Sequence, residues 1–530
     1  MQAPCLCAER IYKKIAGRVV GRLHCIQNKF GGAINLFQGK NTADYRVLLI
    51  YPRITTYKKN LRRITPPLGL AYLAAVLEKE NYKVSILDAA LEGYDTLEPV
   101  DEELVVFGLS PDGIKKRIKA FSPHIVGITF PYSCQAKNVL DICKAVKEVN
   151  KEIKVAVGGI HASALPEKVL SENKEIDFVI IGEGEQTFLE LADSLKENKP
   201  VSGIKGLAFR KDGDGVQINQ PGELIQDLDS LPFPARHLLD MEAYIKINTW
   251  HAPYARKQRV GNIMTSRGCP GVCIYCSSNN FFGHKFRARS VNNIVKEIEF
   301  LISEYKIEEL QFEDDNLTFD RERAMELFRR LKKLNLAWCT PNGVRIDRVD
   351  EQMLKLMKES GCYQITFGVE SGNQQVSTSI IKKGIDLKKV KPTVDAAKKT
   401  GMLVHLFFMV GLPGETKKQM NDTLNFAKHA NPDSASFSIA TPLPGSEMYE
   451  LCLAKGYLKK DFKFEDTIYR KANISTPDFT AKELEEFIDK ANYQFNASLI
   501  YRNPLKFIKK YKNFMLRNPL GVFKAFRKNA

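Results

Sequence analysis

The chain of 530 residues has no long apolar run. No stretch of about 18 uncharged apolar residues occurs, so the sequence predicts no membrane-spanning helix. Its first residues also lack an apolar segment followed by a small-residue cleavage site, so we expect the protein not to be secreted. With 44% hydrophobic and 27% charged residues, the composition is that of an ordinary globular protein. We therefore expect a cytoplasmic protein built from several domain-sized cores.

A disulfide framework is also missing. The eleven cysteines are spread over the length of the chain, and only one tight group of three forms, at Cys269, Cys273 and Cys276. Disulfide-rich proteins are short secreted chains in which cysteine is much denser. The distribution therefore favours a reducing compartment.

The three grouped cysteines have the spacing C-x3-C-x2-C and follow an apolar run, residues 260–265, that predicts a β-strand. Thiolates bind zinc, copper(I) and iron–sulfur clusters. A zinc site usually adds a second Cys or His pair, and here His284 stands alone. Three cysteines without a fourth therefore indicate a [4Fe–4S] cluster in which one iron is open to another ligand.

Residues 45–200 predict a doubly wound, Rossmann-like α/β domain, because short apolar runs alternate there with helical patterns. The expected strands are residues 46–51, 83–87, 125–129, 155–158 and 178–181, and the expected helices are 66–80, 136–149 and 166–173. Ligands of such sheets bind at the carboxyl ends of the strands. The loops at that edge are residues 51–67, 129–133, 158–161 and 182–185.

Residues 261–480 contain a second series of βα units, which begins at the cysteine loop. Strands are expected at residues 260–265, 309–313, 338–344, 364–368, 404–409 and 434–440, with helices at 292–305, 321–334, 351–358, 387–400 and 417–429. Six units predict a partial (β/α)6 barrel, since the complete fold has eight. Residues 201–260 are expected to connect the two domains, with an added strand near residues 206–210.

Positive charge collects at the two ends of the chain. Of the net charge of +17, residues 1–40 contribute +6 and residues 498–530 contribute +9. The extension at residues 1–44 predicts a basic amphipathic helix near its start, and residues 481–530 predict a helical basic tail in which R-N-P-L occurs twice. Such a tail suits peripheral contact with the inner face of a membrane or a solvated pair of helices, and both interpretations stay open. The middle of the chain carries only +2, so no nucleic-acid partner is expected.

Further motifs follow the cysteines at the expected strand ends. They are F-E-D-D-N at residues 312–316, R-I-D at 345–347, G-V-E-S-G at 368–372, G-L-P-G-E-T at 411–416 and P-L-P-G-S at 442–446. Together with the cysteine loop, they resemble the radical S-adenosylmethionine (SAM) enzymes. The preceding domain resembles the cobalamin-binding fold. Residues 45–480 as a whole resemble the cobalamin-binding radical SAM group, which includes class B methylases and the anaerobic Mg-protoporphyrin monomethyl ester cyclase.

The resemblance implies roles for individual residues around the cluster. The three cysteines would hold the [4Fe–4S] cluster, and SAM would bind its open iron. The implied SAM contacts are Tyr275 beside the adenine, Glu313, Asp314 and Asp315 near the amino group, and Arg345, Glu370 and Ser371 near the ribose and carboxylate. Two other interpretations stay open, in which the motif glycines only form tight turns and Asp314 and Asp315 are helix N-caps.

For the first domain, the resemblance implies cobalamin contacts from Thr129, Gly158, Gly159, His161 and Gly182. The paired glycines would let the backbone approach the nucleotide tail. Cobalamin-dependent methionine synthase has D-x-H-x-x-G after its first strand, whereas the corresponding loop here, residues 51–67, contains no histidine. A similar string at residues 88–93 follows the second strand and has Ala90 in the histidine position. We therefore expect base-off cobalamin without a protein histidine ligand, and a domain that has lost cobalamin is the alternative.

The resulting hypothesis is methylation of an unactivated carbon on a hydrophobic or natural-product substrate, such as a lipid-like molecule or a tetrapyrrole. A ferredoxin or flavodoxin would reduce the cluster. The 5′-deoxyadenosyl radical formed from SAM would then remove hydrogen from the substrate, and methylcobalamin would donate the methyl group. Cyclisation, oxidation or rearrangement without methyl transfer is the alternative.

Two other classes fit the sequence less well. RNA methylthiolation would need a second three-cysteine cluster upstream, and residues 45–260 contain only Cys134 and Cys143. A cobalamin or iron–sulfur sensor without enzymatic activity would not need the motifs of a SAM site.

Overall fold

The computed structural model describes residues 45–211, 215–252, 255–468 and 470–502. All of them belong to one compact unit. The predicted N-terminal basic helix and the tail from residue 503 onward lie outside the described residues. Within the described part of the chain, no helix has both the length and the apolarity that crossing a membrane requires.

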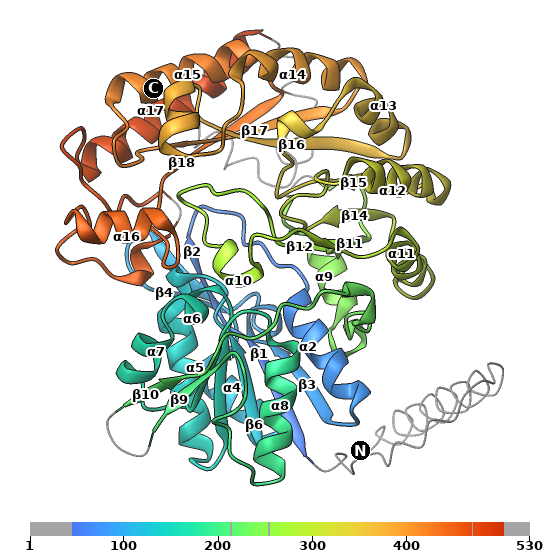
Figure 1. Ribbon diagram of the computed structural model, residues 1–530, viewed down its shortest axis with the longest axis vertical. Coiled ribbons are helices and arrows are strands. Elements are labelled where there is room, and N and C mark those ends of the chain that lie inside the picture. Colours follow the sequence, from blue (N-terminus) through green and yellow to red (C-terminus); the bar gives the residue numbers. More distant parts are fainter. Residues whose placement is uncertain (1–44, 212–214, 253–254, 469, 503–530) are drawn as a thin grey trace, which may run out of the picture. The chain divides into compact units, whose positions relative to one another are not determined.

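The first domain is organised around a seven-stranded sheet in the order β10-β9-β8-β7-β6-β1-β3 (Figure 1). Its five parallel strands are β1 (Arg46–Tyr51), β3 (Lys83–Asp88), β6 (Ile125–Thr129), β7 (Lys154–Gly158) and β8 (Phe178–Ile180). They agree with the five strands that the sequence predicts. β1 pairs with β3 on one side and with β6 on the other, so the direction in which strands are added reverses there. Doubly wound sheets bind their ligands at the carboxyl edge beside such a reversal.

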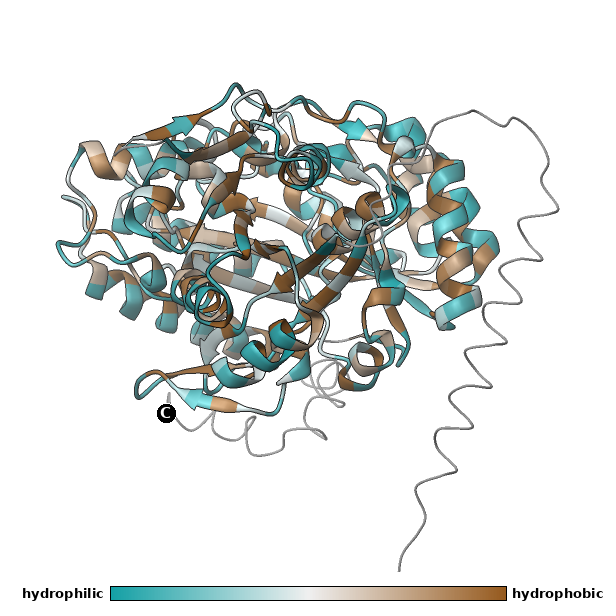
Figure 2. Cartoon of the chain, turned by 90° about the horizontal axis from the view of Figure 1, so that it is seen from below, coloured by the Kyte–Doolittle hydropathy of each residue, from teal (hydrophilic) through white to brown (hydrophobic). Residues whose placement is uncertain are grey.

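Helices cover both faces of this sheet. In β1, Val47 and Leu49 belong to a buried cluster with α2 (Leu68–Lys79) and α8 (Gly184–Lys196). Leu48 and Ile50 belong to another cluster with α4 (Pro111–Phe121) and α5 (Ala136–Val149). This alternation is the geometry of a strand that is buried on both sides. Figure 2 shows the corresponding pattern, in which helices with hydrophilic and hydrophobic residues surround more hydrophobic strands. The predicted doubly wound domain is confirmed.

The first domain also contains further short strands, of which the sequence predicted only the one near residues 206–210. β9 (Leu207–Arg210) and β10 (Val216–Ile218) extend the large sheet in the antiparallel direction, so part of the expected connecting segment completes this sheet. A small antiparallel sheet has the order β2-β5-β4 and consists of β2 (Ile54–Tyr57), β5 (Leu104–Phe107) and β4 (Leu97–Pro99). Strands this short show no readable alternation of polar and apolar residues.

The second domain has six parallel strands that are adjacent in chain order. They are β11 (Val260–Ile263), β14 (Glu309–Phe312), β15 (Ala337–Cys339), β16 (Cys362–Glu370), β17 (Leu403–Val410) and β18 (Ser434–Ile439). The main helices between them are α11 (Val291–Tyr305), α12 (Arg321–Leu334), α13 (Glu351–Glu359), α14 (Val390–Lys399) and α15 (Lys417–Ala430). Among the described strands, β11 and β18 form the two edges, so the sheet stays open. The six strands agree with the six predicted βα units.

The segment after α9 (Met241–Ile247) lies against the second sheet. The backbone of Ala252 exchanges hydrogen bonds with the side-chain amide of Gln311 on β14, at 2.8 and 3.3 Å. The N–H groups of Arg256 and Lys257 donate to the Glu309 carboxylate at 2.7 and 2.9 Å. Buried polar side chains of β14 therefore obtain their partners from the connecting segment. At the other edge of this sheet, α17 (Ala481–Arg502) packs against β18 and α15.

Candidate functional site

The cysteine loop, residues 268–276, follows the short strand β12 (Ser266–Arg267), which pairs with β13 (Arg287–Ala288). Gly268 begins the loop with a φ of +81°. A Cβ at this position would lie 2.3 Å from the carbonyl oxygen of Lys285, so the loop needs glycine here. The turn leads the chain from the strand directly into the first cysteine.

The three cysteine side chains lie near one another and are free thiols of intermediate burial. The Sγ atoms of Cys269 and Cys273 are 3.4 and 3.8 Å from the place where a Cβ on Gly271 would stand. Burial raises the pKa of Cys276 to about 11, with further contributions from the negative charges of Asp315, Cys273 and Cys269. The structure thus brings the three predicted cluster residues together in one loop.

This donor set suits a cluster better than a single ion. Among the described residues, no three His, Cys, Asp or Glu side chains are placed to hold one metal ion. A [4Fe–4S] cluster does not need such a group, because each cysteine binds a different iron and the thiolates stand farther apart. Burial raises the pKa of Cys273 as well, so binding of iron would displace protons from these thiols. The residues present fit a cluster of this kind.

Two later segments of the chain hold the cysteine loop in place. The N–H of Ile274 donates to the carbonyl oxygen of Ile381 at 3.0 Å. On α10 (Asn279–Phe282), which follows the third cysteine, Asn280 Nδ2 donates to the carbonyl oxygen of Gly445 at 2.5 Å. Gly445 belongs to the P-L-P-G-S motif, so this motif supports the segment that follows the cysteines.

Glu370 lies beside the cysteine loop at the end of β16. Its φ is +70°, which is uncommon for a residue other than glycine, and the register with β17 shifts at this point. Lys383 Nζ is 2.8 Å from Glu370 Oε1, and both side chains are mostly buried. Burial, followed by the nearby charges of Glu370 and Cys273, holds the pKa of Tyr275 well above its ordinary value. Tyr275, Glu370 and Lys383 therefore form one group next to Cys273.

Arg345 is also near this group. Its Nε and Nη2 donate to the Asp347 carboxylate at 3.0 and 2.8 Å, and Nη2 donates to the carbonyl oxygen of Lys383 at 3.1 Å. The positive charges of Lys383 and Arg345 act against the raised pKa of Cys273. The structure places these two cations where a carboxylate near the cysteines would be stabilised.

Asp314 has a different environment from its neighbours in the F-E-D-D-N motif. Its carboxylate is buried and accepts hydrogen bonds from the backbone N–H and hydroxyl of Thr265 and from the hydroxyl of Ser266. It therefore binds the segment that leads into the cysteine loop. The N-cap interpretation of Asp314 and Asp315 is wrong, because Asp320 caps α12 through the N–H of Arg323.

Asp315 and Asn316 face the cysteine loop. Asp315 accepts a hydrogen bond from the Ser278 hydroxyl at 2.8 Å. Asn316 Nδ2 lies 3.9 Å from Cys269 Sγ as a donor, and Asn316 Oδ1 is buried with no protein partner. Asn316 was not among the predicted contacts, although its place in the F-E-D-D-N motif was a usable signal.

Glu313 lies at the carboxyl end of β14 and points toward the connecting segment. Its Oε2 is 3.0 Å from Nδ1 of His251, whereas its Oε1 is buried without a hydrogen-bond partner. Asn342 Nδ2 donates to the Glu313 carbonyl oxygen at 2.8 Å. No sequence signal pointed to His251, because it lies in a segment expected only to connect the domains.

Ser371, the remaining predicted SAM contact, is fully buried. Its hydroxyl lies 3.2 Å from Thr423 Oγ1 on α15 and accepts from the N–H of Asn373 at 3.1 Å. Ser371 is thus occupied by contacts within the protein.

The predicted cobalamin residues lie at the carboxyl edge of the first sheet. Thr129 and Gly158 are paired at the ends of β6 and β7. Gly159 has a φ of +110°, and a Cβ there would lie 2.8 Å from the carbonyl oxygen of Phe130. Gly182 follows β8 with a φ of +78°, and its N–H donates to the Ser163 hydroxyl on α6 (Ile160–Ala164) at 2.9 Å. Thr129, Gly158, Gly159 and Gly182 therefore all lie at the carboxyl edge of the first sheet.

His161 is buried on α6. Its imidazole stacks on the Phe130 ring with 4.1 Å between centroids, and its Nδ1 is 2.8 Å from the Ser133 hydroxyl. Burial lowers the pKa of His161 to about 4, so the ring is neutral at physiological pH. Phe464 covers the ring edge at 4.8 Å between centroids. Phe130, Ser133 and Phe464 therefore contact the His161 side chain on different sides.

The string at residues 88–93 has a structural role. The Asp88 carboxylate caps the short helix α3 (Ala89–Glu92) by accepting from the N–H of Leu91, and it accepts from the Tyr244 hydroxyl at 2.5 Å. Burial raises the pKa of Asp88 to about 6. This agrees with the expectation that the string is not a cobalt-ligand motif.

Comparison with known proteins identifies both domains. Residues 54–192 match the B12 binding domain, and residues 263–427 match the radical SAM superfamily. Cytidylyl-2-hydroxyethylphosphonate methyltransferase of Streptomyces wedmorensis is 39% identical over 481 residues, which cover 85% of this chain and 90% of that protein. Anaerobic magnesium-protoporphyrin IX monomethyl ester cyclase of Rubrivivax gelatinosus is 28% identical, over 91% of this chain and 82% of that protein.

A solved structure has the same arrangement of domains. OxsB, a cobalamin-dependent S-adenosylmethionine radical enzyme, superposes with a TM-score of 0.67 at 17% identity, covering 90% of this chain and 72% of that chain. The chain has a B12-binding domain followed by a radical SAM domain, as the cysteine loop and the paired glycines predicted. It belongs to the cobalamin-binding radical SAM enzymes.

Proposed function

We propose that the protein is a methyltransferase that adds a methyl group to an unactivated carbon of a small molecule, using a [4Fe–4S] cluster, SAM and cobalamin. The observation that carries this proposal is the 39% identity to a methyltransferase, which extends over 85% of the chain. When bound, these groups supply the radical and methyl-transfer chemistry. The residues of the chain bind and orient them and exclude water.

Cys269, Cys273 and Cys276 are the proposed cluster ligands. Two observations support this assignment. The Sγ atoms of Cys269 and Cys273 both lie close to Gly271, and all three thiols are free of disulfides. At Cys273, burial raises the pKa, and the nearby charges of Lys383 and Arg345 act in the opposite direction, toward the thiolate form that binds iron.

For SAM we propose two groups of contacts on either side of the cysteine loop. Tyr275, Glu370 and Arg345 would meet the adenosyl and carboxylate parts, because they gather beside Cys273. Glu313 and Asp315 would meet the amino group, since Glu313 Oε1 is a buried acceptor without a protein partner. An ammonium group is the donor that such a carboxylate oxygen favours.

Asp314 and Ser371 take a different part in this proposal. Their polar atoms already bind Thr265, Ser266 and Thr423. We therefore assign them to holding the strand ends in place, while their neighbours contact SAM.

Cobalamin would bind at the edge formed by Thr129, Gly158, Gly159 and Gly182. His161 is packed against Phe130 and Ser133, so we assign it to supporting this edge and not to binding cobalt. The base-off state without a protein histidine follows from this and from the absence of histidine in residues 51–67. Its test is the electron paramagnetic resonance (EPR) spectrum of bound Co(II). A spectrum without nitrogen splitting supports the assignment, and nitrogen splitting contradicts it.

Two relatives suggest which substrates to test. The named substrate of the Streptomyces relative is a cytidylyl phosphonate, so that compound is the first to test. The relative that acts on a tetrapyrrole is less similar, at 28% identity, but covers 91% of the chain. Cyclisation without methyl transfer is therefore the second candidate function.

The remaining proposals concern partners and location. We propose a ferredoxin or flavodoxin as the electron donor and a cytoplasmic protein whose basic tail contacts the inner membrane surface. The support for the tail is its charge of +9 in residues 498–530. Flotation with anionic liposomes, compared between the full chain and a chain ending at residue 497, tests this contact. Equal flotation of both contradicts it.

The decisive experiment uses the full chain, reconstituted anaerobically with iron, sulfide and cobalamin. It is given SAM with a deuterated methyl group, a reductant, and cytidylyl-2-hydroxyethylphosphonate or Mg-protoporphyrin monomethyl ester. Deuterated methyl in a product supports the methyltransferase. Deoxyadenosine with an altered product that lacks deuterium supports the cyclase, and no SAM cleavage contradicts both.

A further inference from the structure

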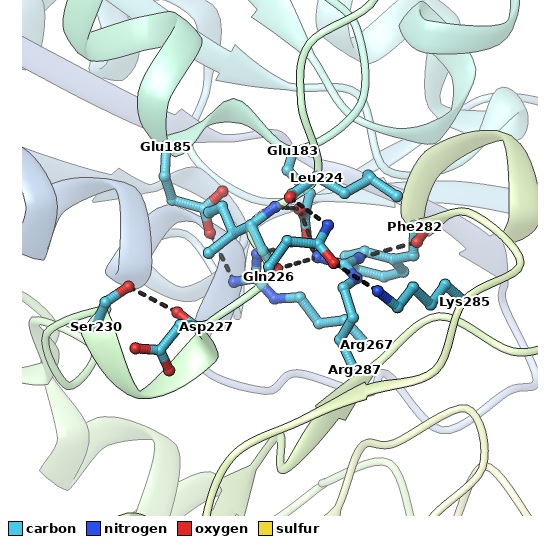
Figure 3. Close-up of polar contacts among 11 residues, drawn as sticks. Glu183, Glu185, Leu224, Gln226, Asp227, Ser230, Arg267, Phe282, Lys285 and Arg287 are labelled. Atoms are coloured by element: carbon cyan, nitrogen blue, oxygen red, sulfur yellow. Dashed lines mark hydrogen bonds and ion pairs between the residues drawn. The ribbon is translucent and has the colours of Figure 1, made fainter.

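Four buried charged side chains join the first domain to the segment that carries the cysteines (Figure 3). Glu183 and Glu185 lie at the start of α8, and Arg267 and Arg287 lie on the paired strands β12 and β13. We call these four residues the charged quartet. Their side chains are only 2 to 9% exposed.

Arg267 contacts both carboxylates of the quartet. Its Nη1 donates to Oε1 of Glu183 at 2.9 Å, and its Nη2 donates to Oε1 of Glu185 at 2.6 Å. The rings of Tyr72 and Phe282 lie 5.3 and 5.8 Å from its guanidinium carbon. A planar guanidinium can hold two separate carboxylates in this way, whereas a lysine ammonium is a single point charge.

Glu183 is the centre of the quartet. Nη1 of Arg287 lies 3.0 and 2.8 Å from its two oxygens, and Oε2 also accepts from the N–H of Ile225 at 2.8 Å. Arg287 continues to the carbonyl oxygens of Ile225 and Phe282, at 2.6 and 2.9 Å. Figure 3 shows these side chains directed toward one another between the two domains.

The energetics indicate that the charged quartet fixes the position of the elements that carry it and does not serve stability alone. Two positive and two negative charges balance, but a buried ion network often stabilises a protein no more than well-packed apolar residues would. Its distinctive property is direction, because each N–H must meet a particular oxygen. The elements that carry the four side chains are therefore held at a defined position relative to one another.

Those elements are the ones that lead to the two cofactor regions. Glu183 directly follows Gly182 at the edge of the first sheet, and Arg267 is two residues before Cys269. On the other side of the cysteine loop, α10 contacts α6, and a Cβ on Gly182 would lie 3.7 Å from the carbonyl oxygen of Phe281. The cysteine loop is thus connected to this edge both before its first cysteine and after its last.

We propose that the charged quartet consists of positioning residues that set the separation between the cysteine-bound cluster and the cobalamin edge. The inference rests on the proposed function. It adds that the separation depends on Arg267, Arg287, Glu183 and Glu185, whose charged groups pair with one another. Misplacement by about 1 Å can lower a rate by roughly 100-fold.

The test compares Glu183→Gln with Asp177→Asn in the full chain loaded with both cofactors. Asp177 is the control, because its carboxylate pairs with Lys147 at 2.7 Å and the two side chains are only 23% and 16% exposed, but it precedes β8, at the end of the first sheet opposite the cobalamin edge. The main measurement is the distance between the reduced cluster and Co(II), obtained by pulsed EPR. Iron and cobalamin contents are measured on the same samples.

For Glu183→Gln we expect unchanged cofactor contents, a shifted or broader distance distribution, and roughly 10-fold more deoxyadenosine per methyl group transferred. Asp177→Asn should match the wild type in both readouts. An unchanged distance and an unchanged ratio in Glu183→Gln would overturn the inference. If that variant does not fold, Arg267→Lys retains the charge but cannot hold both carboxylates, and the same outcomes apply.

The two proposals fail in different ways. A wild-type protein that binds no cobalamin or transfers no methyl group contradicts the proposed function. A wild-type protein that does both, with a Glu183→Gln variant that has the same distance and ratio, contradicts only the positioning role.

Discussion

Asp314 accepts a hydrogen bond from the Ser266 hydroxyl at 2.5 Å, and the same oxygen accepts from the Thr265 hydroxyl at 2.6 Å. The end of β14 is thereby attached to the residues that lead into the cysteine loop. Burial raises the pKa of Asp314, while Arg323 and these hydroxyl donors act in the opposite direction. In one motif, therefore, Asp314 binds the protein, and its neighbour Glu313 keeps an unpartnered oxygen.

This difference predicts that substitution of Asp314 lowers stability, whereas substitution of Glu313 weakens SAM binding. Asp314→Asn replaces a buried acceptor by a group that can also donate, so the free energy of unfolding should fall by about 1–3 kcal/mol. Glu313→Gln should leave stability nearly unchanged and raise the Kd for SAM by roughly 10-fold, as expected when one charge-assisted hydrogen bond is lost. Urea unfolding and equilibrium SAM binding measure the two effects. Weaker SAM binding by Asp314→Asn at full stability would contradict the assignment.

The pair formed by Lys383 and Glu370 gives a second prediction. Lys383→Met leaves the mostly buried Glu370 carboxylate without its 2.8 Å partner, which should lower the free energy of unfolding by about 1–3 kcal/mol. SAM binding should weaken as well, because the carboxylate then faces the cysteine loop uncompensated. Lys391→Met is the control, since its pair with Asp395 is 38% and 42% exposed and should contribute less than about 1 kcal/mol. Equal effects of the two variants would count against a special role for Lys383.

Much of the fold follows from local patterns in the sequence. Alternation in β1 and the amphipathic periods of α5 and α12 depend only on neighbouring residues, so these elements were predicted within a residue or two. The three-cysteine motif was equally visible, because cluster chemistry requires a fixed spacing of thiolates.

Other features depend on contacts between distant residues, which no local pattern records. His251 meets Glu313 across 62 positions of the chain, and Arg267 meets Glu183 across 84. The roles of Asp314 and His161 were also hidden, because only tertiary packing shows which polar atoms the protein itself already occupies. The motifs were therefore visible in the sequence, whereas the contacts that their individual residues make within the protein were not.

A third prediction concerns the cluster itself. Cys273→Ala should lower the iron bound per chain and abolish SAM cleavage after reconstitution, because one iron loses its thiolate. Cys452→Ala, which alters a buried thiol on α16 (Glu447–Ala454), is the control and should keep its iron. Iron analysis, the absorption spectrum and deoxyadenosine formation are measured for both. Full iron content and SAM cleavage in Cys273→Ala would remove the central assignment.

The packing of His161 against Phe130 predicts how stability depends on pH. Burial lowers the pKa of His161 from 6.5 to about 4, so the unfolded chain binds a proton between these values that the folded chain does not. Stability should therefore fall as the pH drops from about 6.5 to about 4, by an amount on the order of 3 kcal/mol, and change no further from this group below pH 4.

His161→Gln should reduce this acid sensitivity, even if lost stacking makes it less stable at pH 7. The control is His284→Gln, at an exposed side chain, and it should keep the wild-type profile. Urea unfolding from pH 4 to pH 7.5 measures all three proteins, and a His161→Gln profile parallel to the wild type would show that the ring is not buried as a neutral group.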